Sequence, residues 1–259
     1  MDPEAWSDDL LSRIEDAGLN ATVPPQQRWL DGWLVRYSPG QARRARCINA
    51  VAAGRLPLDQ KLQLAATVYA AAGLPMVVRV TRFSQPAGLD AALAERGYSR
   101  SDDTWVMVLQ NLPGATRSVP TPLPDGIRLA TLAPLEFAQA VGALRSSPPA
   151  QRHAHGERLA HAPVLHQGCA LVQADGTVLA CGQFTCEAEL VGLYDIVTAE
   201  TARGRGLATR LCEHMLTSSA NHGGKIVYLQ VEGENHAARR IYTRLGFVNA
   251  YAYHYRQQP

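Results

Sequence analysis

Residues 203–208, Arg-Gly-Arg-Gly-Leu-Ala, have the residue types of an anion-binding loop. The glycines at 204 and 206 have no Cβ, so their backbone can approach a ligand closely. A helix predicted to begin at Leu207 would add unpaired N–H groups and the positive end of its dipole. Arg203 and Arg205 would supply charged donors for phosphate oxygens. The loop therefore favours a polyanionic ligand, and the alternative is an ordinary glycine turn with exposed arginines.

Alternating strands and helices are expected to position this loop. In the helix expected at 207–220, apolar residues recur at 3.6-residue spacing, and Gly223-Gly224 ends it. Asn235 can cap the next helix, which has an apolar stripe of the same kind. Strands are expected at Ile127–Leu132, 169–173, 178–186, 189–198, 225–231 and 251–255, and helices at 134–145, 151–162, 207–220 and 238–245. This order predicts a mixed α/β sheet.

Two motifs in this half resemble the GNAT superfamily of N-acetyltransferases. Arg203-x-x-Gly206-x-Ala208 resembles the superfamily's Arg-x-x-Gly-x-Gly/Ala signature and lies at the expected junction of a strand and a helix. Asn235-x-x-Ala238-x-x-x-Tyr242-x-x-x-Gly246-Phe247 resembles its second conserved segment. The resemblance covers residues 126–256, and one departure is Glu200, which stands where the family often has proline.

The N-terminal half repeats the pattern of the C-terminal half. Gly97-Tyr98 precedes Gly246-Phe247 by 149 positions, and the same spacing places Leu58–Ala71 on the helix 207–220 and Val77–Val80 on the strand 226–229. One register for several elements suggests two copies of one architecture. The segment that falls against the loop, 54–59, has a proline and an acid where amides would need to face phosphate. Pro86 and Leu93 fall against Asn235 and Tyr242, so we expect no cofactor site of this kind in the N-terminal copy.

The expected fold is an α/β protein of two tandem GNAT-like domains, each a mixed, mostly antiparallel sheet flanked by helices. Segment 111–128 carries four prolines and two glycines, which disfavour a helix or a central strand. We therefore place a degenerate domain without a cofactor loop at 1–111, a linker at 112–125 and the acetyltransferase domain at 126–259. A chain of 259 residues is long enough for two domains.

The resemblance implies acetyl-coenzyme A (acetyl-CoA) as the cosubstrate. In the family, the loop amides hold the pyrophosphate, and the preceding strand pairs its backbone with the pantetheine arm. The residues implied in cofactor binding are Arg203, Gly204, Arg205, Gly206, Leu207, Ala208 and Thr209 of the loop, Ile196, Val197 and Thr198 of the strand, and Asn235 and Ala238 of the last helix. Asn235 also suits the simpler role of a helix cap.

Acetyl transfer to an amine needs a neutral amine, a stabilised carbonyl oxygen and a protonated leaving thiolate. Tyr242 matches the family's tyrosine that protonates the thiolate, although its place on the apolar stripe also suits simple packing. The resemblance assigns the carbonyl oxygen to an N–H group of strand residues 196–198. Among Glu187, Glu189 and Asp195, which share a face of an unbulged strand, Glu189 best matches the family's strand glutamate as the base. A solvated carboxylate with a water relay is the alternative, and the family's usual bulge could reverse the facing of either end.

The composition narrows the remaining classes of function. A formal net charge of +2 gives no electrostatic footprint for nucleic acid. Five cysteines without a CxxC pair favour reduced thiols over a disulfide framework, and the histidine spacing predicts no metal site. There is no secretory pattern and no run of about 20 apolar residues, so a cytoplasmic protein without a membrane partner is expected.

The sequence therefore predicts an N-acetyltransferase that moves an acetyl group from acetyl-CoA directly to a primary amine in a ternary complex. The acceptor would be a small molecule or a protein or peptide amine, and neither its identity nor the oligomeric state follows from the residues. A non-catalytic acyl-CoA-binding or sensing protein is one alternative. An interaction protein whose partner surface is segment 2–111 is another, and the intact loop argues against it.

Overall fold

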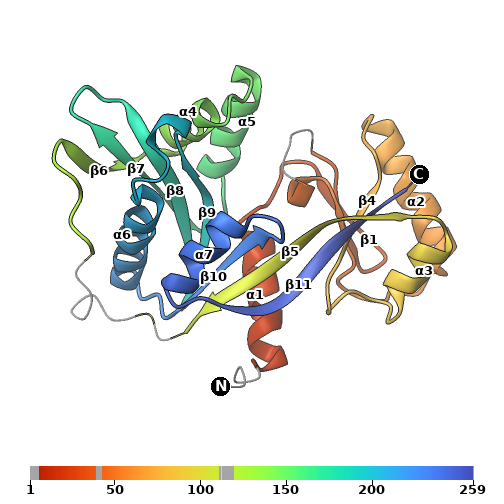
Figure 1. Ribbon diagram of the computed structural model, residues 1–259. Coiled ribbons are helices and arrows are strands. Elements are labelled where there is room, and N and C mark those ends of the chain that lie inside the picture. The colour runs from red at the N-terminus through yellow and green to blue at the C-terminus, as the bar shows by residue number, and fades with distance from the viewer. Residues whose placement is uncertain (1–5, 39–42, 111, 113–119, 259) are drawn as a thin grey trace. The chain divides into compact units, whose positions relative to one another are not determined.

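The computed structural model describes residues 6–38, 43–110, 112 and 120–258 (Figure 1). By their contacts these residues divide into two compact units. Unit 1 consists of the described parts of Met1–Ala21, Met107–Val231 and Asn235–Ala250, and unit 2 of those of Thr22–Val106, Glu232–Glu234 and Tyr251–Pro259. Each unit therefore takes residues from both sides of the expected linker. The linear boundaries at 1–111, 112–125 and 126–259 stay a prediction, and residues 111 and 113–119 lie outside the described residues.

Unit 1 is built on a sheet with the strand order β11-β5-β10-β9-β8-β7-β6. The strands are β5 (Ser99–Leu109), β6 (Ile127–Leu132), β7 (Leu165–Gln173), β8 (Val178–Glu187), β9 (Leu190–Thr198), β10 (Ile226–Glu232) and β11 (Val248–Gln257). The helices are α1 (Asp8–Asn20), α4 (Pro134–Leu144), α5 (Pro149–Ala160), α6 (Leu207–Asn221) and α7 (His236–Arg244). Neighbouring strands from β6 to β9 pair antiparallel, whereas β9 and β10 pair parallel. This mixed sheet with flanking helices confirms the expected fold class.

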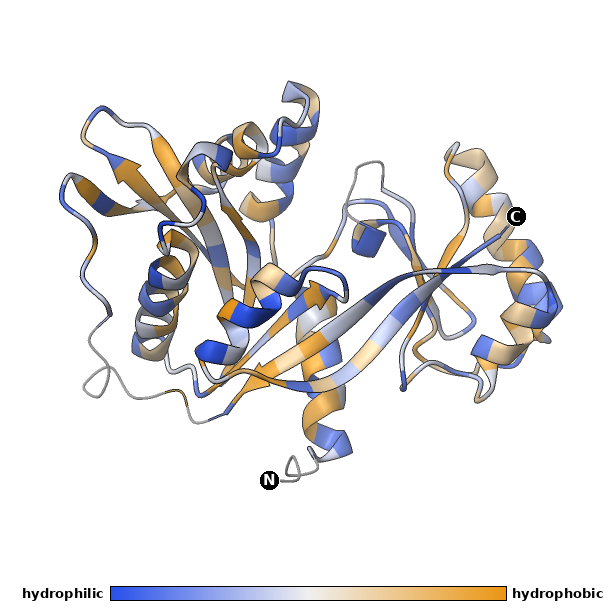
Figure 2. Ribbon diagram, in the orientation of Figure 1, coloured by the Kyte–Doolittle hydropathy of each residue, from blue (hydrophilic) through white to orange (hydrophobic). Residues whose placement is uncertain are grey.

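Helices cover both faces of the unit 1 sheet. Successive residues of a strand point to opposite faces. Cys181 of β8 packs in a core cluster with Phe137 of α4 and Leu159 of α5, whereas a Cβ at Gly182 would meet the side chain of Met215 in α6. The pair α4 and α5 therefore lies on one face of the sheet and α6 on the other. Figure 1 shows α7 in front of the strands, on the same side as α6, and Figure 2 shows hydrophobic strands between these layers.

Local sequence explains the ends of the helices nearest the expected site. α6 begins after Gly206, whose left-handed φ of 72° is easily adopted by glycine. The buried face of α6 includes Leu211 and Met215, as its periodicity predicts. α7 begins after Asn235, whose side-chain Oδ1 accepts a hydrogen bond from the N–H of Ala238 at 3.1 Å. The expected helix cap at Asn235 is confirmed.

Unit 2 contains a second, smaller arrangement of the same kind. Its strand order is β1-β2-β3-β4-β11-β5, with parts of β5 and β11 in each unit. The remaining elements are β1 (Gln27–Leu30), β2 (Trp33–Arg36), β3 (Ile48–Asn49), β4 (Val77–Val80), α2 (Leu58–Ala71) and α3 (Leu89–Glu95). A core cluster that includes Trp33, Tyr69 and Val78 joins the helices to the strands.

The expected repeat is visible in the element boundaries. α2 and α6 begin at residues 58 and 207, β4 and β10 at 77 and 226, and β5 and β11 at 99 and 248, each pair 149 positions apart. Gly97 and Gly246 take left-handed φ values of 78° and 93° at corresponding places before β5 and β11. The two copies therefore share one architecture.

Some strands are longer than their local sequence indicates. β7 begins at Leu165 rather than at 169, because Leu165 pairs with Cys186 at the end of β8. β11 covers Val248–Gln257 rather than 251–255, and its last residues pair with β4 from Val80 to Val77. Pairing with a neighbouring strand thus extends both elements.

Candidate functional site

The parallel strands β9 and β10 separate halfway along β9. Their pairing runs from Leu190–Ile226 to Leu193–Leu229 and ends there, although β9 continues to Thr198 and β10 to Glu232. On its other side β9 stays paired with β8 as far as Thr198. The second half of β9 therefore has a free edge towards β10.

A bulge lies where the two strands separate. Gln183 of β8 faces Tyr194, but Cys181 faces Val197, so β9 uses one residue more than β8 over this stretch. Asp195, inside the bulge, has a left-handed φ of 53°. Aspartate visits this conformation more readily than most side chains do.

The hydrogen bonds after the bulge show which N–H groups face the free edge. The N–H of Ala199 donates to the carbonyl of Leu179, at the β8 side, at 2.8 Å. Successive N–H groups of an extended strand point to alternate sides. The N–H groups of Thr198 and Ile196 therefore face away from β8, whereas that of Val197 faces β8. Of the three residues expected to meet pantetheine, Ile196 and Thr198 have donors on the open side.

The loop before α6 has the features of an anion cradle. Gly204 and Gly206 both take left-handed φ values, 75° and 72°. No described side chain caps α6, so the first N–H groups of the helix have no partner within it. A Cβ at Gly204 would meet nothing within 4 Å, which leaves the space in front of the loop open. The loop residues 203–206 are exposed, and Leu207 anchors the helix in the core.

Arg210 holds this loop in place, a role that the sequence motif does not signal. Its Nη1 donates to the carbonyl of Arg205 at 3.2 Å, and its Nε donates to the carbonyl of Pro122 at 3.1 Å. One guanidinium therefore connects the loop to the segment that precedes β6.

Tyr242 lies buried on the face of α7 that includes Ala238. Its ring packs edge-on against Phe247, with a centroid distance of 6.0 Å. Burial raises the pKa of Tyr242, and the neighbouring Cys212 of α6 raises it further. The phenol therefore stays protonated at neutral pH, and its hydroxyl is close enough to α6 for Cys212 to influence it.

Glu187 and Glu189 lie at the turn between β8 and β9, at the far end from the bulge. Arg13 of α1 forms an ion pair with Glu189, and the Asn20 side chain donates to Glu187 at 2.9 Å. Glu189 precedes Ile196 by seven residues, which corresponds to roughly 20 Å along a strand. The hydrogen bond from Arg13 lowers the pKa of Glu189. Ile196 and Thr198 therefore lie on the strand that leads to the loop, and Tyr242 of α7 is near Cys212 of the helix that follows the loop, whereas Glu189 lies at the other end of β9.

Comparison with known proteins finds relatives of this chain among the acetyltransferases. The sequence profile of the "Acetyltransferase (GNAT) family" matches residues 137–247. A relative named "Uncharacterized N-acetyltransferase YobR", from Bacillus subtilis (strain 168), is 27% identical over 239 residues, covering 89% of this chain and 91% of that protein. Over residues 137–247 the chain is therefore similar to the GNAT family of acetyltransferases.

Solved structures of the superfamily have the same fold. A "GCN5-related N-acetyltransferase from Kribbella flavida" superposes with a TM-score of 0.66 and 18% identity, covering 96% of this chain and 95% of its own. A "Tandem GNAT protein from the clavulanic acid biosynthesis pathway" superposes with a TM-score of 0.62 and 17% identity over 78% of this chain and 70% of its own. At such identities the likeness concerns the fold, and it supports the tandem arrangement.

A cluster of polar side chains surrounds Asp195 on the α4 and α5 side of the unit 1 sheet. Arg145, at the end of α4, donates to Asp195 Oδ1 at 2.7 Å, and Gln183 of β8 donates to Oδ2 at 2.7 Å. His155 Nε2 of α5 lies 3.5 Å from Oδ2. Burial alone would raise the pKa of Asp195, but Arg145 and His155 bring it to about 2. Asp195 is therefore a fixed anion.

In the N-terminal copy, a carboxylate from the chain itself fills the corresponding loop. Asp31 accepts hydrogen bonds from the N–H groups of Arg55 and Leu56 at 2.8–2.9 Å. Lys61 is buried, its Nζ lies 3.5 Å from Asp31 Oδ2, and it donates to the Asp31 and Ala53 carbonyls at 2.7 Å. A Cβ at Gly54 would lie only 2.2 Å from Asp31 Oδ2. This occupation supports the expectation that the N-terminal copy has no cofactor site.

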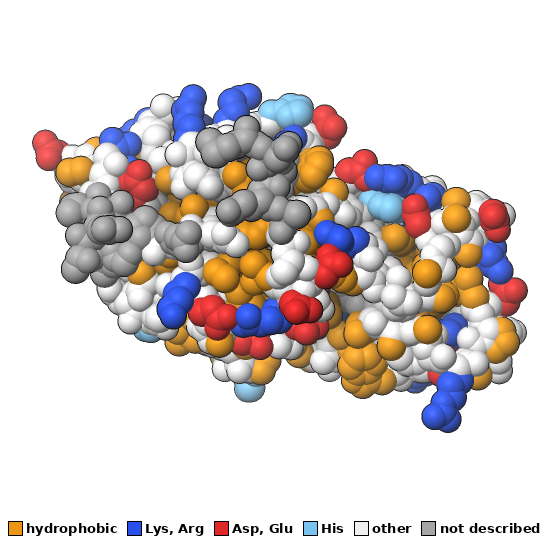
Figure 3. All heavy atoms as spheres, turned by 90° about the horizontal axis from the view of Figure 1, so that it is seen from below, with side chains coloured by type: hydrophobic (Ala, Val, Ile, Leu, Met, Phe, Trp, Pro, Cys, Tyr) orange, Lys and Arg blue, Asp and Glu red, His pale blue; other side chains and the backbone are white. Residues whose placement is uncertain are grey.

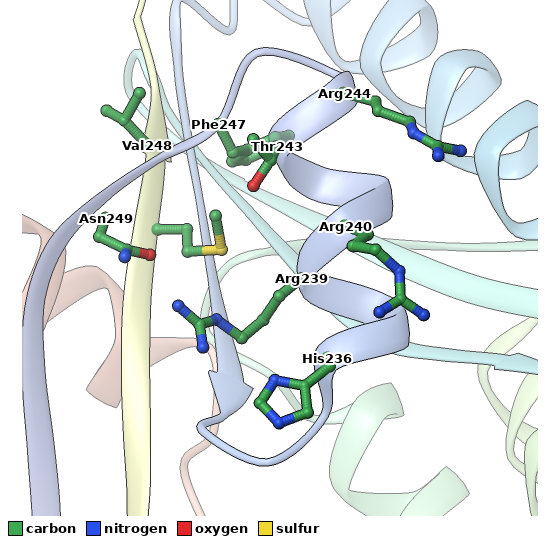
Figure 4. A pocket seen from close by; sticks show the side chains of 9 residues that line it. His236, Arg239, Arg240, Thr243, Arg244, Phe247, Val248 and Asn249 are labelled. Carbon is green, nitrogen blue, oxygen red and sulfur yellow. The ribbon is translucent and has the colours of Figure 1, made fainter.

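A basic hollow lies on another side of α7 (Figure 4). Its volume is about 650 Å³, and its lining residues are Met107, His236, Arg239, Arg240, Thr243, Arg244, Phe247, Val248 and Asn249. Figure 4 shows side chains of α7 on one flank and strand residues on the other. None of the expected site residues lines it, so this hollow is separate from the opening between β9 and β10.

The surface and the remaining side chains add three observations. On the face drawn in Figure 3, acidic and basic side chains lie intermixed. Within the described ranges, no helix is long and apolar enough to cross a bilayer. Over the same residues, no group of three or more His, Cys, Asp and Glu side chains could hold a metal ion.

Proposed function

We propose that this protein transfers an acetyl group from acetyl-CoA to a primary amine. The observation that carries the proposal is the separation of β9 from β10 next to an uncapped helix with a glycine loop. Such a place offers strand donors for an amide-rich arm and helix donors for phosphates within one ligand's length. The similarity to GNAT acetyltransferases supports acyl transfer in general, and these donors favour coenzyme A as the carrier.

Donors of the loop, of β9 and of the start of α7 support such a cosubstrate. We assign the pyrophosphate to the N–H groups and arginines of 203–209, where the space before Gly204 is open. Ile196 and Thr198 would pair with the pantetheine amides through N–H groups on the free edge of β9, with Val197 holding that edge to β8. Asn235 and Ala238 would border the arm from the start of α7, where the Asn235 side chain already fixes the helix end.

The chain's own groups would then assist three changes in bonding. Acetyl-CoA supplies a thioester whose carbonyl carbon accepts the nitrogen lone pair of a neutral amine. The N–H of Ile196 would stabilise the negative charge that develops on the carbonyl oxygen. When the C–S bond breaks, Tyr242 would donate its phenolic proton to the departing sulfur and regain a proton afterwards from solvent or from the amine.

The amine itself must arrive without its extra proton. A lysine-like amine has a pKa of roughly 10, so about one molecule in a thousand is neutral at pH 7. Glu189 is remote from Ile196 and paired with Arg13, and Asp195 has both carboxylate oxygens occupied. We therefore propose that water takes the amine proton, which was the open alternative to a strand glutamate.

A non-catalytic acyl-CoA-binding protein is the second candidate. The observation in its favour is the same lack of an available carboxylate near Ile196 among the described residues. Both candidates need the loop, but only the enzyme needs Tyr242 to exchange a proton.

The first experiment is calorimetric titration of the whole protein with acetyl-CoA. We expect a Kd in the micromolar range for the wild type and at least tenfold weaker binding for Arg203→Ala combined with Gly206→Glu. The matched control is Arg100→Ala, which removes another exposed arginine, one paired only with its neighbour Asp103 in the described structure. A thiol-release assay with a panel of primary amines then separates the two candidates. If the folded wild-type protein does not bind acetyl-CoA, both candidate functions are wrong.

A further inference from the structure

The carboxylate of Asp195 is held by side chains from three elements of unit 1, and it lies beside the proposed reaction site. Its carboxylate connects three elements: the end of α4 through Arg145, β8 through Gln183 and α5 through His155. Gln183 is buried, and its amide Nε2 donates to Asp195, so its Oε1 must face the Nδ1 of His166, which is 3.2 Å away. The tautomer of His166 is thereby fixed, with the proton on Nδ1.

These contacts argue against Asp195 as the base. One of its oxygens accepts from Arg145, the other from Gln183, and Arg145 and His155 hold its pKa at about 2 against the effect of burial. A carboxylate with so low a pKa is too weak a base to remove the proton of an ammonium group efficiently. His155, in contrast, is neutral at neutral pH, because burial lowers its pKa to about 4.

The backbone at Asp195 suggests a different role. The residue takes a φ of 53° inside the bulge, and the chain direction after the bulge decides where the next N–H groups point. Without the extra residue, Ile196 would exchange its orientation with its neighbours, because N–H groups alternate along a strand. The N–H of Ile196 would then face β8 instead of the opening towards β10.

We infer that Asp195 is a positioning residue that, clamped by Arg145 and Gln183, keeps the β9 bulge in register and aims the Ile196 N–H at the acyl carbonyl. The clamp connects the bulge to α4 and to β8, which are separated from Asp195 by 50 and 12 positions in sequence. This inference rests on the proposed acetyl transfer, and it adds Asp195, Arg145 and Gln183 as residues that position the reacting groups.

The test is a graded series at position 195 in the full-length protein. Asparagine keeps the shape, accepts hydrogen bonds and tolerates the left-handed conformation; glycine keeps only the conformation; alanine keeps neither. We expect kcat to fall in the order wild type, Asp195→Asn, Asp195→Gly, Asp195→Ala. The loss should be within about tenfold for asparagine and on the order of 100-fold for alanine. The Kd for acetyl-CoA should stay within about twofold, since the loop is unchanged.

A base at Asp195 predicts another pattern. Asparagine, glycine and alanine would then be equally inactive, because none of them can take a proton, and that result would overturn the inference. Wild-type kcat in all three variants would overturn it equally. Arg145→Met provides a second route if the alanine variant does not fold, because it removes the clamp and leaves Asp195 in place; it should lower kcat at unchanged Kd.

Hydrogen exchange gives a readout that does not depend on catalysis. The N–H groups of Val197 and Ala199 face β8 and should exchange at least tenfold faster in Asp195→Ala and in Arg145→Met than in the wild type. Exchange within α6 serves as the internal control. Unchanged exchange at Val197 would refute the clamp. If the wild type transfers no acetyl group but Val197 responds as described, the proposed function fails and the clamp survives.

Discussion

Replacing Tyr242 by phenylalanine tests the proposed proton donor with the least disturbance of the fold. The ring lies in the core and contacts Phe247 edge-on at 6.0 Å, and phenylalanine fills the same space. The free energy of unfolding should change by no more than about 1 kcal/mol, the usual effect of one hydroxyl group. A positioned acid contributes on the order of 10² to 10⁴ in rate, so we expect kcat to fall at least 100-fold.

The assay combines thiol release under saturating acetyl-CoA with calorimetric Kd values for the same preparations. The matched control is Tyr69→Phe in unit 2, where a buried hydroxyl donates to the Arg36 carbonyl at 2.7 Å. It should cost about 1 kcal/mol of stability and leave kcat unchanged. Unchanged kcat in Tyr242→Phe would remove this tyrosine from the mechanism. A parallel loss of kcat and of affinity would assign it a packing role instead.

Three further predictions follow from the same geometry. Because no described carboxylate serves as the base, kcat/KM for a lysine-like amine should rise with pH towards the amine pKa of about 10. The value of kcat/KM should not fall again within this pH range, because burial raises the pKa of Tyr242 and keeps its phenol protonated. A plateau of kcat/KM above pH 6–7 would instead indicate that a side chain acts as the base. Arg210→Ala should weaken acetyl-CoA binding by about tenfold without lowering the melting temperature by more than a few degrees, because it frees the Arg205 carbonyl. Lys61→Met should lower the thermal midpoint of unfolding by several degrees with no change in acetyl-CoA affinity, which scanning calorimetry and titration would check together.

The local parts of the site could be predicted because they depend on neighbouring residues. The conformation of Gly206 and the cap at Asn235 are set by a few adjacent side chains, so a short motif carries the information. The repeat could be predicted for the same reason, since α2, β4 and β5 begin 149 positions before α6, β10 and β11. The predicted domain boundaries are based on the repeat in sequence. The compact units are defined by contacts instead, and the long strands β5 and β11 each contribute residues to both units.

The parts of the site that depend on distant residues gave no local signal. Arg145 reaches Asp195 across 50 positions and Arg210 reaches Pro122 across 88, so neither contact follows from sequence spacing. Alternation along an unbroken strand would give Glu189 the same face as Asp195. The turn at 188–189 and the bulge at Asp195 break that alternation. A bulge changes the facing of every residue on one side of it.

The two copies differ in whether a carboxylate of the chain itself occupies the loop before the helix. Arg210 and Lys61 occupy corresponding positions, and each donates to a carbonyl of the loop before its helix. In the N-terminal copy the loop N–H groups already bind the Asp31 carboxylate at 2.8–2.9 Å. A phosphate would have to displace an anion that is covalently part of the chain and therefore always present at high local concentration. In the C-terminal copy no described carboxylate reaches loop residues 204–206, and the donors stay available. The exposed, uncapped start of α6 is thus the feature that a phosphate-bearing cosubstrate would satisfy, and its closure by Asp31 in the other copy shows what such donors bind when a carboxylate is within reach.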